Sequence, residues 1–523
     1  MKRRSRKVGI VFYLSVIIVS LFVIWGIVSP TRLGATTSTA FSYITETFGW
    51  FYLVVTFIFL VFSLYAAFGP YGRIKLGKKD DDPDYSYVSW LAMLFSAGMG
   101  IGLVFWGVAE PIMHYTDPPE GVTPETVEAA RTGLRYTFFH WGLHPWAVYA
   151  VVGMALAYTQ FRKEGAGLIS ATFRPLIGDG VNGPIGKIID VLAAIATAAG
   201  VATSLGLGAM QINGGLTHLT GLPNSAGTQL AIIVAVTALF MISAVSGLDR
   251  GIKMLSNVNL SLASLLLLFV LMAGPTIFLM DTLTTTLGSY IGNIVTMSFR
   301  LTPFTGSDWI GTWTLFYWAW WIAWAPFVGT FIARISKGRT IREFVLTVMV
   351  MPTLLGALWF AAFGGSGLHL QMEKGVNLAN VVNENMEAAL FVTLQQFPLG
   401  TALSILATAL IITFFVTSAD SATFVLGTIT SKGGTLQPKT YVKIIWGLLI
   451  SGIAAVLLLS GGLEGLQTAS FIAALPFSIV MLLMVVSLNR TLKSEVAKER
   501  QREKLRIQKL EELIEENIQN SDR

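Results

Sequence analysis

The chain has 523 residues, of which 53% are hydrophobic and only 13% are charged, and its mean hydropathy is +0.65. This composition excludes an ordinary soluble domain and indicates a membrane protein with several spans. There is no cysteine, which excludes disulfides, thiolate metal sites and thiol catalysis.

Apolar stretches of about twenty residues recur along the chain. They contain Gly and Pro and lack the alternation of barrel strands, so they predict an all-α polytopic membrane protein. The first span follows basic residues as a signal peptide does, but no cleavage site stands out after it, so we expect a retained helix. We place twelve transmembrane helices near residues 9–28, 49–68, 88–110, 139–161, 186–213, 227–247, 255–279, 309–333, 341–363, 398–426, 440–461 and 467–489.

The distribution of Lys and Arg predicts which ends of these helices face the cytoplasm. With the N-terminus placed inside, 31 of the 36 basic residues fall in the two terminal tails and the inner loops. The other five are Arg32, Arg131, Arg135, Arg300 and Lys374. This asymmetry predicts that both termini are cytoplasmic. The net charge of +6 follows from this topology and requires no nucleic-acid partner.

The third span contains SAGMGIGLVFWG, residues 96–107, with glycine at positions 98, 100 and 102. This spacing resembles a nucleotide loop, but no strand precedes it, so that interpretation fails. Alternate glycines in a membrane helix indicate either a close contact between helices or an interrupted helix. An interruption at mid-membrane frees backbone groups for an ion or a carboxylate, as in secondary transporters.

Two aromatic segments follow, in the fourth and eighth spans. HWGLHPWAVY (140–149) contains two tryptophans and a tyrosine, and FYWAWWIAWAP (316–326) has four tryptophans within seven residues. At about 100° per residue, five aromatic residues in and just before the second segment share one helix face: Trp313, Tyr317, Trp320, Trp321 and Trp324. An interfacial belt or core packing is the ordinary explanation, although a belt fits their central position poorly. Two aromatic faces can instead form a box for a quaternary ammonium group, at about 0.5 to 2 kcal/mol per ring.

We expect almost no Asp or Glu near this box, which favours a zwitterionic guest or purely aromatic recognition. His140 and His144 lie four residues apart on an expected helix face. Without an HExxH motif or cysteine partners, we interpret both histidines as structural.

The tenth span contains FFVTSADSAT, residues 414–423, which brings hydroxyl groups and one carboxylate into an apolar helix. Such oxygens suit a hard cation such as Na⁺, although serine and threonine also bond back to their own helix. The C-terminal tail after Arg490 has helical apolar spacing, with basic residues first and acidic residues later. A solvated or self-associating helix is one interpretation, and a regulatory arm that senses ions or the inner leaflet is the other.

Together these segments resemble the betaine/choline/carnitine transporter family, from the third span through the twelfth. The motifs that carry the resemblance are GMGIG at 98–102, AEP at 109–111, the Trp141, Trp146, Tyr149 spacing, SLGLGA at 204–209, the segment 316–344 and TSADS at 417–421. The resemblance implies a homotrimer with the leucine-transporter-type fold of two inverted five-helix repeats. The implied parts are a basic cytoplasmic tail (1–8), two leading helices (9–68), repeats at 88–279 and 309–489, an amphipathic connection (282–300) and a charged cytoplasmic tail helix (490–523).

The resemblance also implies the residues of a transport site. It places the substrate box at Trp141, Trp146, Tyr149, Trp320, Trp321 and Trp324, with Gly98, Met99, Gly100 and Gly102 facing the substrate carboxylate. It places a sodium site around Ser96, Met99, Phe414, Thr417 and Ser418, and a possible second sodium site at Thr197 and Phe327. Sodium-independent carnitine exchangers depart from GMGIG, and choline carriers often end it in Asp. Met99 and Gly102 therefore agree with sodium-coupled uptake of a betaine.

We therefore expect a secondary active transporter of the cell membrane, with no catalytic residue and no cofactor. Its partners would be a quaternary-ammonium compatible solute, first of all glycine betaine, with Na⁺ as the coupling ion and membrane lipid around it. Uptake by alternating access would serve osmoprotection. A choline, carnitine or ectoine carrier, proton-coupled or exchanging, is the alternative within the family. A channel needs a continuous polar pore and an intramembrane enzyme needs a catalytic cluster, and the sequence indicates neither.

Overall fold

The structure is a computed structural model that describes residues 8–98, 100–246, 249–434 and 438–521. The described residues form helices and two isolated β-bridges but no strand, which confirms the all-α prediction. Within this part of the chain, nine helices are long and apolar enough to cross a membrane. They are α1 (Ile10–Val28), α2 (Pro30–Phe68), α8 (Pro184–Thr220), α9 (Ala226–Ser246), α10 (Asp249–Ala273), α12 (Phe316–Ile335), α13 (Ile341–Glu373), α16 (Gly400–Thr430) and α17 (Thr440–Ser521).

Shorter helices lie between these long ones. They are α3 (Tyr87–Gly98), α4 (Ile101–Thr116), α5 (Val127–His140), α6 (Leu143–Ala157), α7 (Arg174–Ile177), α11 (Thr276–Ser298), α14 (Leu378–Glu384) and α15 (Ala389–Gln395). Single turns of 3₁₀ or π geometry complete the chain: η1 (Tyr158–Arg162), η2 (Ser170–Phe173), η3 (Gly178–Asn182), η4 (Gly311–Leu315) and η5 (Met386–Ala388).

The expected span at 88–110 is divided between α3 and α4. Helix α3 ends at Gly98 and α4 begins at Ile101, while Gly100 has extended backbone angles (φ −143°, ψ −173°). This part of the chain is therefore the interrupted helix that one reading of the glycine pattern predicted. Met99 lies outside the described residues.

The expected continuous span at 139–161 is wrong at its beginning. Helix α5 ends at His140 and α6 begins at Leu143, so Trp141 and Gly142 form a break. Pro145 has no N–H to donate to the carbonyl of Trp141, four residues earlier, and this favours a break there. A Cβ at position 142 would also collide with the Phe138 carbonyl oxygen. His140 and His144 are therefore not neighbours on one continuous helix face.

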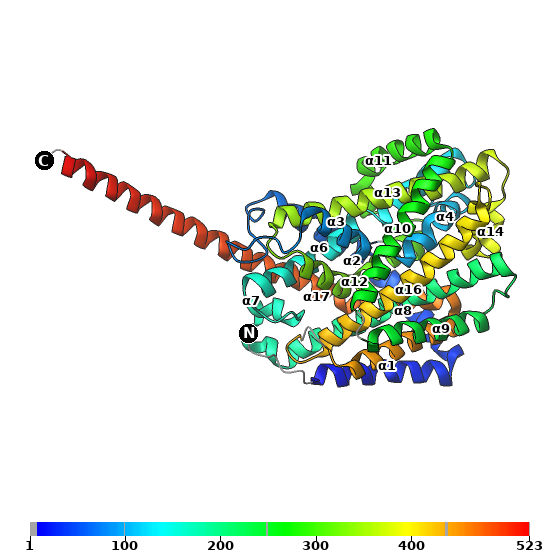
Figure 1. Cartoon of the computed structure of the whole chain (residues 1–523), viewed down its shortest axis with the longest axis horizontal. Coiled ribbons are helices and arrows are strands. Elements are labelled where there is room, and N and C mark those ends of the chain that lie inside the picture. The colour runs from blue at the N-terminus through cyan, green and yellow to red at the C-terminus, as the bar shows by residue number, and fades with distance from the viewer. Residues whose placement is uncertain (1–7, 99, 247–248, 435–437, 522–523) are drawn as a thin grey trace.

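Helix α17 combines the two expected spans at 440–461 and 467–489 with the tail. A kink at Gly462 (φ 56°, ψ −130°) separates the spans, in a backbone conformation that glycine adopts without strain. The helix then continues past Arg490 without a break, and its red C-terminal end projects from the bundle (Figure 1). A second boundary also differs, because the connecting helix α11 begins at Thr276 rather than at 282.

Helices α8 and α12 lie in the middle of the bundle. Helix α12 packs against α6, α8 and α17, and α8 packs against α16 and α17 (Figure 1). The α12 side chains that face these neighbours are large, and Trp318 and Trp320 are almost fully buried. Such a helix, apolar on every side, is typical of a bundle core.

Loops that the basic-residue count placed on one side meet at one end of the bundle. Lys75 forms a β-bridge with Thr340, and Val8 forms one with Ser431. Arg162, after α6, forms an ion pair with Glu495 of α17 (2.7 Å). At the other end, the loops before α5 and before α12 meet, since the Trp309 Nε1–H donates to the Asp117 carbonyl (2.8 Å).

Candidate functional site

One cavity of about 660 Å³ lies between helices α3, α4, α6, α8, α10, α12 and α16. Cavities of this size hold small organic ligands. The predicted site residues that line it are Gly100, Gly102, Trp141, Trp146, Tyr149, Trp320, Trp321, Trp324, Phe327, Phe414, Thr417 and Ser418. Residues from two aromatic segments, one glycine motif and one hydroxyl motif therefore meet around one space.

Aromatic rings from two helices form one wall of the cavity. Trp320 and Trp321 are stacked, with centroids 4.9 Å apart and planes 16° apart. The Trp141 ring stands edge-on to Trp321 at 4.9 Å, and Tyr149 does so at 6.2 Å. Trp146 extends the series with a 5.5 Å edge contact to Tyr149. Rings that meet at steep angles present both faces and edges to the cavity, as a box for a cation requires.

Most indole N–H groups of this wall donate hydrogen bonds to other groups of the protein. Trp321 donates to the backbone carbonyl of His140 (2.9 Å), and Trp324 donates to that of Gly200 (2.7 Å). Trp141 donates to a carboxylate oxygen of Glu110 (2.9 Å). The Trp320 Nε1–H has no hydrogen-bond partner among the described residues. These bonds hold the rings in place, so the wall offers a guest mainly aromatic carbon.

Gly102 of α4 lies directly against the aromatic wall. A Cβ at this position would lie 2.7 Å from Cη2 of Trp320 and 3.0 Å from Cη2 of Trp141. Both distances are shorter than ordinary carbon contacts. Glycine here lets the backbone of α4 approach the two indoles, which explains one of the alternate glycines in the motif.

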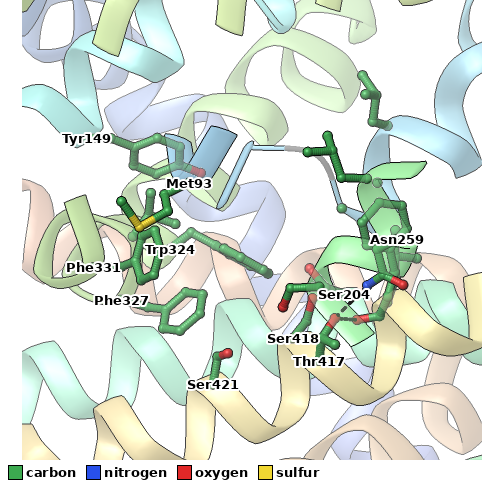
Figure 2. Close-up of a pocket in the computed structure, with 18 of the residues that line it drawn as sticks. Met93, Tyr149, Ser204, Asn259, Trp324, Phe327, Phe331, Thr417, Ser418 and Ser421 are labelled. Carbon is green, nitrogen blue, oxygen red and sulfur yellow. Dashed lines mark hydrogen bonds between the residues drawn. The ribbon is translucent and has the colours of Figure 1, made fainter. Parts of the chain in front are cut away.

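A group of polar side chains forms the opposite side of the cavity (Figure 2). Thr417 and Ser418 come from α16, Asn259 from α10 and Ser204 from α8. The Asn259 amide Nδ2–H donates to Thr417 Oγ1 (3.0 Å). The buried Asn259 Oδ1 has no partner within the described ranges. Several neutral oxygens close together are the ligands that a hard cation prefers.

Asn259 was missed in the sequence, and Ser204 was noted only as part of the SLGLGA motif and not as a site residue. Their signal was weak, because a single Asn in an apolar span and a Ser between glycines each have ordinary structural explanations. Only the packing of α8 and α10 against α16 brings them to the hydroxyl motif.

Some predicted site residues lie elsewhere or cannot be placed. Within the described part of the chain, the cavity lining does not include Thr197, whose hydroxyl bonds back to the Ala193 carbonyl (2.8 Å). Of the second expected ion position, only Phe327 faces the cavity. Met99 lies outside the described residues, and Ser96 and Gly98 are described only as part of α3.

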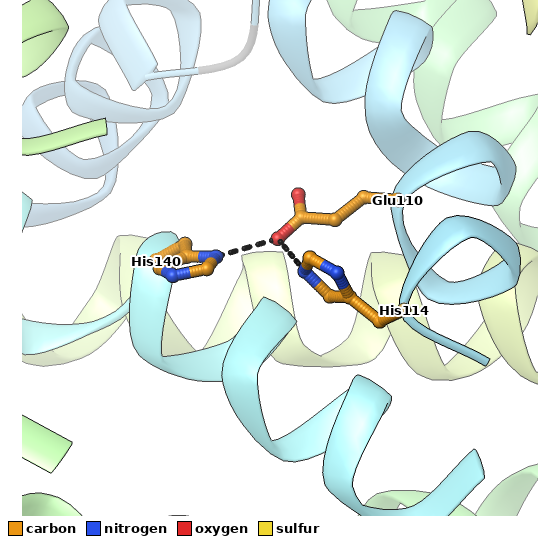
Figure 3. A group of neighbouring side chains, drawn as sticks. All are labelled: Glu110, His114 and His140. Atoms are coloured by element: carbon orange, nitrogen blue, oxygen red, sulfur yellow. Dashed lines mark hydrogen bonds and ion pairs between the residues drawn. The ribbon is translucent and has the colours of Figure 1, made fainter. Parts of the chain in front are cut away.

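We expected almost no Asp or Glu near the aromatic box, but one carboxylate lies directly against it. Glu110 of α4 is fully buried directly behind Trp141. Its Oε1 lies 2.8 Å from His140 Nδ1 and 3.2 Å from His114 Nε2 (Figure 3). These three side chains bring ligand atoms within 4.8 Å of one another, a spacing that could hold a metal ion. The signal was the acidic residue in AEP at 109–111, which can be assigned to the box only once α4 and α5 are packed together.

The cavity extends from the aromatic wall toward the end of the bundle where the basic loops meet. Its lining includes exposed Tyr85, just before α3, exposed Ser89 in the first turn of α3, and Ser421, one turn beyond Thr417 on α16. On the other side of the wall, Glu110 and both of its histidines are fully buried. Among the described residues, the cavity lining therefore extends toward the end of the bundle where the basic loops meet, while the Glu110 group lies buried behind the wall.

These features define a multi-pass membrane protein with a solute-sized cavity among its described helices. The sequence matches the family described as "BCCT, betaine/carnitine/choline family transporter" over residues 10–497. The chain belongs to this transporter family.

Three relatives are similar over nearly their full lengths. The glycine betaine transporter OpuD of Bacillus subtilis (strain 168) is 54% identical, over 96% of this chain and 97% of the relative. An ectoine/hydroxyectoine transporter of Virgibacillus pantothenticus is 50% identical, over 92% and 96%. A probable glycine betaine transporter of Desulfitobacterium hafniense (strain Y51) is 45% identical, over 94% and 99%.

Proposed function

We propose that this protein is a secondary active transporter that carries glycine betaine into the cell together with Na⁺. The observation that carries the proposal is that an aromatic wall and a group of neutral oxygens line the same cavity. A solute with a quaternary ammonium group and a small hard cation could then bind side by side. Similarity to glycine betaine transporters supports the choice of solute.

The aromatic wall suits a quaternary ammonium group because such a group donates no hydrogen bond. The indole N–H groups of Trp321 and Trp324 are already bonded to backbone carbonyls. The ring faces remain to attract a cation, at about 0.5 to 2 kcal/mol per ring. The carboxylate of the zwitterion would lie toward Gly100 and Gly102, where α3 and α4 are interrupted and an N-terminal helix end is available.

The oxygen group suits Na⁺ as the coupling ion. Thr417 and Ser418 supply hydroxyls, and Asn259 supplies a carbonyl oxygen that is buried without a partner among the described residues. Each positive charge moved inward gains about 2.3 kcal/mol per 100 mV of membrane potential. Cotransport of Na⁺ with a neutral zwitterion would therefore concentrate the solute, as osmoprotection requires.

The cavity corresponds to the inward-facing state of an alternating-access cycle. Its lining extends to the end where the basic loops meet, which the basic-residue count assigns to the cytoplasm. We place both termini there and count twelve spans, by adding the α3–α4 pair, α6, and the part of α17 beyond its kink to the nine long helices. The two inverted five-helix repeats and a homotrimer are part of the same proposal.

Uptake of radiolabelled glycine betaine into proteoliposomes tests the coupling. We expect saturable accumulation with an inward Na⁺ gradient and none with an equal K⁺ gradient. The double variant Thr417→Ala, Ser418→Ala should lose Na⁺ dependence, whereas Thr413→Ala, at a half-buried position one turn earlier on α16, is the matched control. Uptake driven equally by K⁺, by protons or by internal substrate would refute Na⁺ symport. Non-saturable flux would indicate a channel.

Ectoine is the second candidate solute, because an ectoine/hydroxyectoine transporter is 50% identical to this chain. Ectoine is also a zwitterion with a delocalised cation, so the same wall could accept it. Competition by unlabelled ectoine, choline and carnitine against labelled betaine in the same proteoliposomes would rank the solutes. A tenfold preference for ectoine would change the assigned substrate but not the mechanism.

A further inference from the structure

Glu110 accepts hydrogen bonds from four side chains. His114 Nε2 (3.2 Å) and His140 Nδ1 (2.8 Å) bond to Oε1, and Trp141 Nε1 (2.9 Å) and the Tyr317 hydroxyl (2.5 Å) bond to Oε2. All of these side chains are buried, and they come from helices α4, α5 and α12 and the turn after α5. Four donors around two oxygens match an ionised carboxylate, which only accepts hydrogen bonds.

The partners of this carboxylate among the described residues are two histidines, an indole and a hydroxyl. No Lys or Arg in the part of the chain that the structure describes pairs with Glu110. The Thr314 hydroxyl lies 2.9 Å from His140 Nε2 and can donate to it. His140 can then be neutral, with its proton on Nδ1, a tautomer assigned here from its hydrogen bonds. A negative charge surrounded by neutral donors would lie directly behind the aromatic wall.

We propose that Glu110 is a specificity-determining residue that supplies the counter-charge for the cationic end of the substrate. This inference rests on the proposed function. Glu110 does not line the cavity and so acts through Trp141, whose N–H bonds to the carboxylate while its ring lines the cavity. An anion that accepts the indole N–H increases electron density in the ring, so the ring attracts a cation more strongly. The direct attraction also acts through the low-dielectric interior.

The same bond fixes the orientation of the wall. Trp141 meets Trp321 and Trp320 edge-on, at 4.9 and 6.2 Å. The backbone carbonyl of His140 holds the Trp321 indole, while the His140 ring holds Glu110. One turn between α5 and α6 therefore orients two indoles of the box. A site that is ordered before the substrate arrives loses less entropy on binding.

Glu110→Gln separates the charge from the hydrogen bonds. The glutamine carbonyl can accept from Trp141 and Tyr317, and its amide can face the two histidines after they exchange tautomers. His140 would then donate from Nε2 to Thr314. The variant therefore keeps the shape and the bonds of the network and loses only the negative charge. His144→Gln is the matched control, because His144 is a buried histidine in the first turn of α6 that bonds to Ser298 (2.9 Å) instead.

The assay is binding to the purified full-length protein, followed by tryptophan fluorescence. The probes are glycine betaine and 3,3-dimethylbutanoate, in which an uncharged tert-butyl group replaces the trimethylammonium group. We expect Glu110→Gln to raise the Kd for glycine betaine about tenfold, which is about 1.4 kcal/mol. The variant should bind the uncharged isostere as tightly as the wild type does, or more tightly. The ratio of the two Kd values, which measures the preference for the cation, should therefore fall. His144→Gln should bind glycine betaine like the wild type.

Several results would overturn the proposal. Unchanged betaine affinity in Glu110→Gln, or an equal loss for both probes, would assign Glu110 a structural role. Tyr317→Phe removes one neutral donor and leaves the charge, so an effect as large as that of Glu110→Gln would assign the change to hydrogen bonding. Loss of betaine binding by the wild type after treatment with a metal chelator would mean that a metal holds the three side chains. If the untreated wild type binds no betaine, the proposed function itself fails.

Discussion

Gly102→Ala should damage the solute site without preventing the fold. The added methyl would lie 2.7 Å from Trp320 and 3.0 Å from Trp141, about 0.5 to 1.3 Å closer than ordinary carbon contacts. Neither indole can turn away freely. Trp141 is bonded to Glu110 (2.9 Å), and Trp320 is stacked between Trp321 and Phe316, with planes 16° apart in each pair.

Overpacking of this kind costs about 1 to 3 kcal/mol. If the indoles are displaced from their positions in the box, the cost appears as a weaker Kd for betaine, by about 5- to 150-fold. Titration of purified protein by tryptophan fluorescence gives the Kd, and a parallel melting curve reports stability. We expect the Kd to change much more than the melting temperature.

Gly356→Ala in α13 is the control, because its added Cβ would meet only the Trp141 carbonyl oxygen among the described atoms, at an ordinary 3.8 Å. It should bind betaine within twofold of the wild type. The reasoning is refuted if Gly102→Ala retains wild-type affinity, or if Gly356→Ala is equally impaired. A lower melting temperature with unchanged Kd would place the strain outside the box.

Three further variants test other parts of the structure. Trp321→Leu should raise the KM for betaine uptake about 2- to 30-fold through loss of one ring, with the amount of folded protein unchanged by size-exclusion chromatography. Asn259→Ala should raise the Na⁺ concentration for half-maximal uptake several-fold while the betaine KM at saturating Na⁺ changes little. A raised betaine KM with an unchanged Na⁺ requirement would remove Asn259 from the ion site. Burial alone would raise the pKa of Glu495, but hydrogen bonds and positive charge from Lys163 and Arg162 lower it to about 2. Because the folded-state pKa is depressed, the wild type should be more stable than Glu495→Gln. This difference in stability should be complete above the ordinary carboxyl pKa of about 4.3 and should disappear only as the pH falls toward 2. Unfolding midpoints measured over this pH range test the expectation.

The helical structure and the apolar nature of the segments could be predicted from the sequence, because both depend on composition over about twenty residues. The apolar runs predicted an all-helical chain, and the alternate glycines of 98–102 indicated the interruption between α3 and α4 as one of two readings. The tryptophans of 316–326 predicted an aromatic helix face, and their segment lines the cavity. Each of these signals is local and needs no knowledge of neighbouring helices.

Helix ends were predicted less well, because proline and glycine act there through single backbone contacts. The break at Trp141 and Gly142 follows from the missing N–H of Pro145 and from the close approach of the Phe138 carbonyl oxygen, which leaves no room for a Cβ at Gly142. A window of apolar residues does not detect either cause. The same limitation applies to the start of α11 at Thr276 and to the uninterrupted passage of α17 into its tail.

Tertiary structure alone decided which polar groups share the site. Glu110 and His140 are 30 positions apart, and Asn259 and Thr417 are 158 apart, yet both pairs are hydrogen-bonded. Such pairs form because a buried polar group must find its partner on whichever helix packs against it. The sequence by itself therefore determined the helices, the aromatic face and the family. Packing decided that a carboxylate lies behind the aromatic wall and that an amide completes the oxygen group opposite.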